Sequence, residues 1–267
     1  MPKHSPPRLA DANLKLKADR ESYDAELLQL QEELHDLQRS LRAARGRAIV
    51  VFEGWDAAGK GGAIRRMTAR LDPRGLKVWP IGPPGQLEQQ HHYMHRFWKR
   101  LPEEGTLAIF DRSWYGRVLV ERVEGLAPKP DWQRAYREIN TFERLLCDDG
   151  LLLIKLFMHI SPAEQLHRFQ RRLDDPTKRW KLTPEDLRNR SKQPAYEKAI
   201  SAMLQRTSTK HAPWTVIPAE DKRYGRLAAM RTVIKGLHPA LPPPPTHVDS
   251  EVARLALGLN LRLPHEG

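Results

Sequence analysis

The sequence of 267 residues contains a single cysteine, Cys147, and no long apolar run. One cysteine excludes an intramolecular disulfide and a cysteine-based zinc site, and we interpret Cys147 as a helix residue. The longest apolar stretch, residues 151–160, is interrupted by Lys155 and is too short to span a bilayer. Residues 1–7 also lack the apolar run of a secretory signal. We therefore expect a cytoplasmic protein that does not enter a membrane.

Acidic residues are scarce relative to basic ones. The chain has 45 Lys and Arg against 33 Asp and Glu, which gives a formal net charge of +12. Such an imbalance concerns binding partners rather than fold. Nucleic acid, inorganic polyphosphate and nucleotides are the candidate polyanions, and a solvated basic surface is the alternative. The position of the charges along the chain has to decide between them.

Apolar runs and helical periodicities alternate along the chain. The apolar runs predict strands at 47–53, 77–81, 106–110, 151–159 and 215–218. Helical spacing or helix-start signals predict helices at 16–45, 60–71, 88–99, 114–121, 131–148, from 161 onward, and at 222–237. The first of these is amphipathic, and packing against its own domain is favoured over a coiled-coil dimer. Alternating strands and helices indicate an α/β fold, with a parallel sheet flanked by helices.

The domain organisation follows from the same survey. Residues 1–15 are polar and contain proline, which predicts a disordered arm. Residues 16–237 form the predicted domain, and 238–267 form a Pro-rich C-terminal tail. Ligands of parallel α/β sheets bind beyond the carboxyl ends of the strands, where Glu53 and Asp111 both lie. The motifs that contain these ends should therefore converge.

The strongest motif is the run Gly54-Trp55-Asp56-Ala57-Ala58-Gly59-Lys60 between a strand and a helix. Backbone amides of such a loop bind phosphate oxygens, and the lysine neutralises charge on the transferred phosphate. Gly61 occupies the place where Ser or Thr normally ligates magnesium, so we assign that role to Asp56. A turn or helix-capping role is the alternative for Asp56. We expect substrate contacts from Gly54, Ala57, Ala58, Gly59 and Gly61.

A second motif, Asp111-Arg112-Ser113, ends the third predicted strand. Phosphoryl-transfer enzymes place a metal-binding carboxylate at such a position, and Asp111 is the second predicted metal ligand. Arg112 can bridge donor and acceptor phosphates through two hydrogen bonds. The alternative is that Asp111 only caps the next helix.

A basic segment follows the fourth strand. Its cations include Arg168, Arg171, Arg172, Lys178 and Lys181, and Pro176 interrupts it. We interpret residues 173–210 as a helical lid that closes over phosphates, with a solvated surface helix as the alternative. His91, His92 and His95 are predicted to share one helix, but without a nearby acid they make a poor metal site.

These motifs resemble the type-two polyphosphate kinase family. The likeness is in residues 54–62, in Phe110-Asp111-Arg112-Ser113-Trp114-Tyr115-Gly116-Arg117 and in Arg179-Trp180-Lys181-Leu182, and it extends over about residues 16–237. The run 118–125 is most similar to polyphosphate:AMP phosphotransferases. The resemblance implies a thymidylate-kinase-like P-loop core, a helical basic lid, dependence on Mg²⁺, use of inorganic polyphosphate and a homo-oligomer, dimer or tetramer.

The resemblance also implies roles for individual residues. Asp56 and Asp111 match the metal-binding aspartates of the family. Lys60, Arg112 and Arg172 match its phosphate-binding residues. Further predicted substrate-binding residues are Arg117, Glu121, Arg168, Lys178 and Lys181, and Glu121 bears on the choice of acceptor.

Three functions are compatible with these observations. The leading hypothesis is magnesium-dependent phosphoryl transfer between polyphosphate and a nucleotide, from AMP to ADP and also from ADP to ATP, with guanine nucleotides left open. An ATP-dependent nucleoside monophosphate kinase of the thymidylate type is the alternative enzyme, although the basic lid carries more charge than one nucleotide needs. A nucleic-acid-binding NTPase or a polyphosphate binder is the third, and a binder would make no ADP. We expect no nucleic-acid partner.

Overall fold

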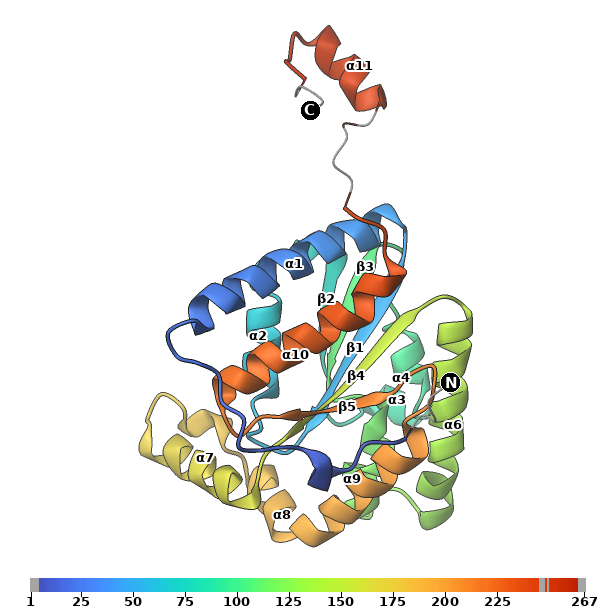
Figure 1. Ribbon diagram of the computed structural model, residues 1–267. Helices are drawn as coiled ribbons and strands as arrows, with labels where there is room; N and C mark the ends of the chain where they lie inside the picture. The colour runs from blue at the N-terminus through green and yellow to red at the C-terminus, as the bar shows by residue number, and fades with distance from the viewer. Residues whose placement is uncertain (1–4, 245–247, 249, 264–267) are drawn as a thin grey trace.

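The computed structural model describes residues 5–244, 248 and 250–263, and its centre is a five-stranded parallel sheet (Figure 1). The strands are β1 (Arg47–Gly54), β2 (Leu76–Pro80), β3 (Thr106–Asp111), β4 (Leu152–His159) and β5 (Trp214–Pro218), in the spatial order β2-β3-β1-β4-β5. The sequence-based prediction of an α/β fold with a parallel sheet is therefore confirmed, and all five strands lie within a residue or so of their predicted positions.

The register places the two predicted motifs side by side. Phe52 of β1 pairs with Asp111 of β3, and Gly54 pairs with Met158 of β4. The chain runs from β1 to one side of the sheet for β2 and β3, and then to the other side for β4 and β5. A crevice opens where the strand order reverses in this way, beyond the carboxyl ends of β1 and its neighbours.

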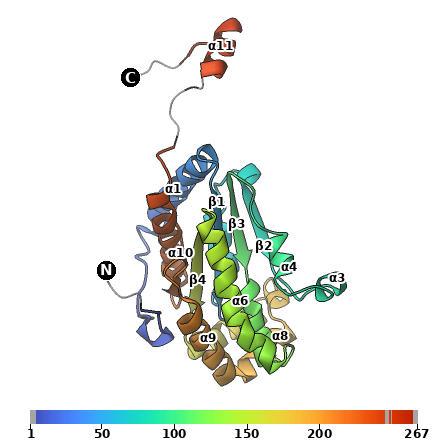
Figure 2. The ribbon, with the colours of Figure 1, turned by 90° about the vertical axis from the view of Figure 1, so that its right-hand side faces the viewer.

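Helices cover both faces of the sheet, as Figure 2 shows edge-on. One face is covered by α1 (Tyr23–Ala43), α2 (Lys60–Met67) and α10 (Lys222–Leu237), whose apolar side chains form one buried cluster with β1. The other face is covered by a 3-10 turn, Trp114–Val118, and by α6 (Lys129–Asp148) and α9 (Gln193–Thr207). The apolar stripe of α1 is buried against its own domain and contacts α10, as the spacing favoured.

The remaining elements are short or lie at the sheet's carboxyl edge. They are α3 (Gln86–Gln89), α4 (His95–Trp98), α5 (Val120–Val123), α7 (Pro162–Asp174), α8 (Pro184–Ser191), α11 (Ser250–Gly258) and 3-10 turns at Leu9–Asp11, Pro73–Gly75, Arg179–Lys181 and His238–Ala240. None of the described residues of α11 is buried. No helix in the described ranges has the length and apolarity needed to cross a membrane.

Four predicted helices differ from the observed ones. The helix expected at 60–71 ends at Met67. The helix expected at 16–45 begins only at Tyr23, because the Asp19 side chain accepts hydrogen bonds from the backbone and hydroxyl of Ser22 and holds a turn there. The helix expected at 88–99 is two short helices, α3 and α4, joined by a hydrogen bond from Arg100 to Glu88. The helix expected at 114–121 is a 3-10 turn followed by α5.

Two predicted boundaries also differ from the observed packing. Residues 5–15 belong to the predicted disordered arm, yet Leu9 is buried in the core cluster on the α6 side of the sheet; residues 1–4 lie outside the described ranges. The predicted lid of 173–210 includes α9, whose buried residues Ala199, Ile200 and Met203 belong to the same cluster. Only the stretch 175–191, here called the outer lid, lies outside the core.

Candidate active site

The phosphate loop between β1 and α2 has the backbone that a phosphate-binding loop requires. Gly54, Ala57 and Gly59 all have positive φ angles, of 150°, 62° and 105°. A Cβ atom at Gly54 would lie 2.4 Å from the carbonyl oxygen of Met158, so this position must be glycine. The Lys60 Nζ donates hydrogen bonds to the carbonyl oxygens of Gly54 at 2.9 Å and Trp55 at 3.2 Å, across the loop.

The buried side chain of Arg168 binds the backbone of this loop. Its side chain is 2% exposed, and its Nη1 donates to the carbonyl oxygens of Ala57 and Ala58 at 2.9 and 3.0 Å. Its Nη2 donates to Ala219 and Glu220, and its Nε donates to Glu164. All five N–H donors of the guanidinium are used within the protein. The predicted substrate contact of Arg168 therefore does not fit, because the side chain has no donor left for phosphate.

Arg112 connects the second motif to the loop. It follows Asp111 at the end of β3, has a φ of 65°, and donates its backbone N–H to Phe52 at 2.9 Å. Its guanidinium donates to an oxygen of Asp56 at 3.2 Å and to Glu185 of α8 at 3.3 Å. Burial alone would lower the pKa of Arg112, but the charges of Asp56 and Glu185 outweigh it and raise that pKa. The cation is thus fixed between two carboxylates.

Asp56 lies at the centre of this arrangement, with its side chain 13% exposed. One oxygen faces Arg112, and the other accepts a hydrogen bond from the Asn189 amide at 2.8 Å. Its backbone carbonyl accepts from Gln165 at 3.1 Å. Two of these partners, Gln165 and Asn189, were not found by sequence reasoning.

The two predicted metal ligands are compatible with Mg²⁺. Asp111 lies beside the first turn of α2, because a Cβ atom at Gly61 would be 4.0 Å from its Oδ2. Among the described residues no group of three or more His, Cys, Asp or Glu side chains forms a metal cage, so the three histidines at 91–95 form none. Mg²⁺ commonly binds through one or two carboxylates, and substrate phosphates and water complete its shell. Asp56 and Asp111 fit that pattern.

Glu53 and Ser113 form a buried hydrogen-bonded pair next to Asp111 and Arg112. Glu53 is the residue before the end of β1, is 5% exposed, and accepts a hydrogen bond from the Ser113 hydroxyl at 2.8 Å. Burial raises the pKa of Glu53, while Ser113, Lys60 and Arg112 oppose that shift. The pair fixes the turn that follows Arg112. The sequence indicated Glu53 as a residue near the site because it lies at the end of a predicted strand.

Two cavities meet at this site. A smaller one extends under α8 and α9 and is lined by apolar side chains such as Leu119, Val120, Phe157 and Ile200. A larger, open cleft follows the phosphate loop and contains Lys60, Asp111, Arg172, Lys178 and Lys181. Asp56, Arg112 and Glu185 line both. A group bound in one cavity can therefore reach a group bound in the other at these three side chains.

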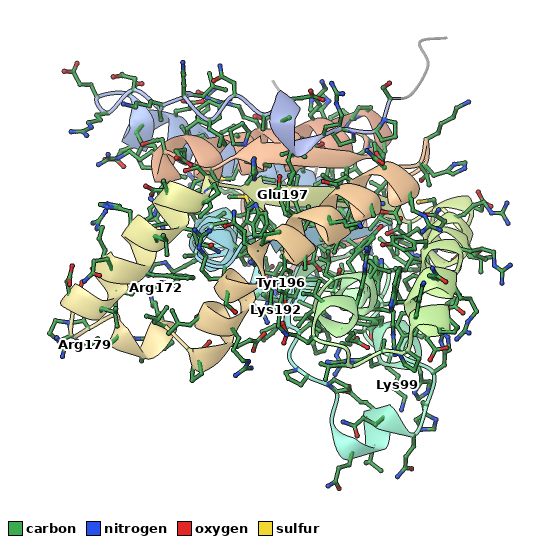
Figure 3. The ribbon with its side chains drawn as sticks, turned by 90° about the horizontal axis from the view of Figure 1, so that it is seen from below. Lys99, Arg172, Arg179, Lys192, Tyr196 and Glu197 are labelled. Atoms are coloured by element: carbon green, nitrogen blue, oxygen red, sulfur yellow. The ribbon has the colours of Figure 1, made fainter. Side chains whose placement is uncertain are left out.

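Arg172, Lys178 and Lys181 border the larger cleft, whereas Arg190 of the predicted lid lines the smaller cavity. Arg172 projects from α7 toward α8 and donates to the carbonyl oxygen of Lys181 at 2.9 Å, and Asp186 is 3.9 Å away (Figure 3). Lys178 contacts Asp175, and the Lys181 ammonium lies 5.1 Å from the centre of the Trp180 ring. Arg172 contacts the start of α8 through Asp186, which follows the junction residue Glu185, whereas Lys178 contacts only Asp175 of the outer lid.

Arg117 and Glu121 lie apart from both cavities. They form an ion pair at 3.1 Å, and Arg117 stacks on the Tyr93 ring at 4.4 Å from its centre. Burial raises the pKa of Glu121, and Arg117 opposes the shift. Neither residue lines the cavities, although the Glu121 carboxylate lies behind Gly116, which does. The structure therefore does not bring these two predicted substrate-binding residues to the junction.

Comparison with known proteins gives consistent results. The profile of the family described as polyphosphate kinase 2 matches residues 17–242. A polyphosphate:AMP phosphotransferase of Pseudomonas syringae is 48% identical over 87% of this chain and 47% of its own length. An ADP-polyphosphate phosphotransferase of Pseudomonas aeruginosa is 41% identical over 86% of this chain and 76% of its own.

A solved structure gives the same comparison in three dimensions. Polyphosphate kinase 2 from Arthrobacter aurescens superimposes with a TM-score of 0.88 at 32% identity, covering 96% of this chain and 94% of that one. The chain spans about half the length of the Pseudomonas syringae relative.

Proposed function

The chain belongs to the polyphosphate kinase 2 family, and from this premise we propose that it transfers phosphate between inorganic polyphosphate and a nucleotide. The single observation that supports this best is the shared border of the two cavities. Asp56 and Arg112 line both an open cationic cleft and an adjoining apolar cavity. The cations of the first suit a polyanionic donor, and the apolar side chains of the second, together with Gln165, Asn189 and Gln193, offer a surface on which a nucleoside can lie once α8 moves.

The residues supply charge and orientation rather than covalent catalysis. Phosphoryl transfer depends mainly on positioning and on stabilising the charge of the transferred group. Lys60 and the loop amides hold the donor end, and Arg112 bridges donor and acceptor phosphates. Arg172 closes over them from α7. Mg²⁺, held by Asp56 and Asp111, supplies charge neutralisation when bound.

Contacts from α8 already occupy part of the junction. Glu185 accepts a hydrogen bond from Arg112, and Asn189 donates to Asp56. We propose that substrate phosphate takes the place of Glu185 on Arg112 and that α8 moves away when substrate binds. Opening and closing of such segments sets the rate of many enzymes.

AMP is the proposed preferred acceptor, with ADP second and guanine nucleotides open. Support comes from the run 118–125 and from the Pseudomonas syringae relative, whose name gives AMP as its acceptor. The homo-oligomer, a dimer or a tetramer, stays a prediction, and light scattering would measure its size. The cytoplasmic location also stays a prediction.

The test is an acceptor panel. Purified protein is incubated with Mg²⁺, long-chain polyphosphate and AMP, ADP, GMP or GDP in turn, and products are separated by chromatography. Lys60→Ala is the inactive control. Fastest conversion of AMP to ADP supports the proposal, and use of ADP with AMP inert would contradict the acceptor assignment. Phosphorylation with ATP as the only effective donor would favour the thymidylate-kinase type.

A further inference from the structure

Arg112 has a backbone conformation that needs support from its surroundings. Its φ of 65° lies in the left-handed region, which a residue with a Cβ atom adopts at a cost and keeps only where neighbouring contacts fix it. The backbone N–H of Arg112 donates to Phe52, and the Ser113 hydroxyl donates to Glu53. These contacts fix the chain as far as Ser113. The conformation of Arg112 also depends on how the chain continues beyond that residue.

The two residues that follow Ser113 are hydrogen-bonded to one buried carboxylate. Glu143, on α6, is 1% exposed, and its Oε1 accepts from the Trp114 indole at 3.0 Å and from the Tyr115 hydroxyl at 2.6 Å. Both aromatic side chains are fully buried. The turn is therefore anchored at three successive residues, 113–115, and the last two are anchored to Glu143.

Lys155, on β4, completes this arrangement. Its ammonium donates to the second oxygen of Glu143 at 2.7 Å, and it also donates to the Tyr115 hydroxyl at 2.8 Å and to the carbonyl oxygen of Thr207 at 2.7 Å. Thr207 is the last residue of α9, where the helix dipole favours a cation. Both oxygens of Glu143 and all three donors of the ammonium are thus used. The cluster joins the turn to β4, α6 and α9, which cover one face of the sheet together (Figure 2).

Apolar side chains could fill the space that this ion pair occupies. Leu153 and Phe157 lie on the same face of β4 as Lys155 and are buried in the apolar cluster there. A buried ion pair seldom stabilises a fold more than apolar residues of similar volume do. Stability alone therefore does not account for a charged pair at this place. The donors of the turn, in contrast, require an acceptor, which the Glu143 carboxylate supplies.

We propose that Glu143 and Lys155 are positioning residues for phosphoryl transfer, which fix the turn after Arg112 and thereby hold its guanidinium at the junction of the two cavities. Neither residue lines a cavity itself. The inference rests on the proposed function, in which Arg112 bridges donor and acceptor phosphates. A guanidinium displaced by about 1 Å would still attract both phosphates but would stabilise the transferred group less. The effect should therefore appear in kcat rather than in KM.

The experiment replaces the pair without leaving an unpaired charge. Glu143→Leu with Lys155→Met, here called the Leu–Met variant, removes the pair together with the acceptor. Glu143→Gln with Lys155→Met, the Gln–Met variant, removes the charges but keeps an amide oxygen that can accept from Trp114 and Tyr115. For each variant kcat, KM for AMP, KM for polyphosphate and the melting temperature are measured.

A milder variant has its own matched control. Tyr115→Phe keeps the ion pair and the Trp114 hydrogen bond but removes one anchor of the turn. Tyr136→Phe removes the hydroxyl of another buried tyrosine on the same side of the sheet. That hydroxyl accepts from Arg122 and is not part of the Glu143 cluster.

The Leu–Met variant should lose about tenfold or more in kcat, with both KM values within about twofold of the wild type, because small misplacements of a catalytic group are costly. The Gln–Met variant should be at least about threefold faster than the Leu–Met variant, since it retains the acceptor. Tyr115→Phe should lose about two- to fivefold in kcat, the scale of one hydrogen bond, and Tyr136→Phe should match the wild type.

A double-mutant cycle tests whether the pair acts through Arg112. In an Arg112→Lys background, Tyr115→Phe and the Leu–Met substitutions should cause little further loss, because the group that they position is already replaced. General damage to the fold would instead add its full effect to that of Arg112→Lys. Crystal structures provide a readout that needs no activity. In the Leu–Met variant the Arg112 guanidinium should leave its position 3.2 Å from Asp56.

Wild-type kcat of the Leu–Met variant would overturn the inference, and so would equal losses in the Leu–Met and Gln–Met variants or full additivity with Arg112→Lys. If the Leu–Met variant does not fold, Tyr115→Phe gives the same test, and a kcat equal to that of Tyr136→Phe would overturn the inference. Failure of the proposed function is a different result. In that case the wild type makes no ADP from AMP, while the crystal structures still show whether Arg112 moves when its anchors are removed.

Discussion

The Asn189 amide donates to the Asp56 carboxylate at 2.8 Å, across 133 positions of sequence. This bond, with the contact between Glu185 and Arg112, ties α8 to both motifs of the site. On our proposal, substrate phosphate replaces Glu185 on the Arg112 guanidinium. Side chains of α8 thus cover part of the junction, while the larger cleft beside it is open.

Glu185→Gln should therefore strengthen acceptor binding. The Arg112–Glu185 pair is partly exposed, and exposed ion pairs contribute little, so we expect KM for AMP to fall by about two- to fivefold with kcat nearly unchanged. Glu197→Gln, at an exposed position on α9, is the matched control. A rise in KM on removing the Glu185 charge would show that this carboxylate assists binding.

Asp111→Asn should reduce the rate by about 10²-fold or more, the scale of losing one preorganised electrostatic group. Asp56→Asn should behave similarly, because Gly61 supplies no hydroxyl in its place. Initial rates across a Mg²⁺ titration provide the measurement. If Asp56→Asn keeps the wild-type rate and Mg²⁺ dependence, Asp56 is not a metal ligand.

Two glycines of the phosphate loop should respond in opposite ways to alanine. At Gly54 the new Cβ would meet the Met158 carbonyl oxygen at 2.4 Å, so the loop must move, and we expect a loss of about 10²-fold in rate. At Gly61 the nearest atom is 4.0 Å away, and alanine should stabilise α2 by about 0.5–1 kcal/mol. Initial rates and denaturation midpoints of the two variants test this prediction. Equal damage at the two positions would contradict the loop geometry described above.

Lys155 and Glu143 form a fully buried ion pair at 2.7 Å, and Lys155 also donates to Tyr115 and Thr207. Burial lowers the pKa of Lys155, and Glu143 opposes that shift. Lys155→Met leaves the Glu143 charge without its partner and should cost about 3–5 kcal/mol of unfolding free energy. Chemical denaturation measures the loss, with Lys235→Met at an exposed position of α10 as the control. Equal stability of the two variants would show that Glu143 is neutral in the fold.

The sequence predicted the strands and the motifs at their ends, because these depend on local patterns of residues. Each strand is rich in apolar residues, and parallel α/β sheets place the strand ends at one edge. The sequence therefore predicted that Asp111 and the loop of Lys60 lie close together. Helix ends were less predictable, because the helical spacing at 88–99 does not show that the chain leaves the helix between α3 and α4.

Long-range contacts account for what sequence reasoning missed. Nothing in the pattern around Asn189 or Glu185 indicates that α8 docks on Asp56 and Arg112. Arg168 has the residue type of a phosphate ligand, and only the three-dimensional structure shows that its donors are all used by backbone and Glu164.

The most direct test of the account is the initial rate of ADP formation from AMP against donor chain length, at two salt concentrations. If polyphosphate is the donor and lies along the cationic cleft, the rate at subsaturating donor should rise with chain length until the cleft is filled. Long chains should also lose affinity steeply with added salt, because each phosphate contact releases a counterion. ATP, which reaches only the inner cleft, should be less sensitive to salt. Equal rates with tripolyphosphate and long chains, both indifferent to salt, would contradict polyphosphate as the donor.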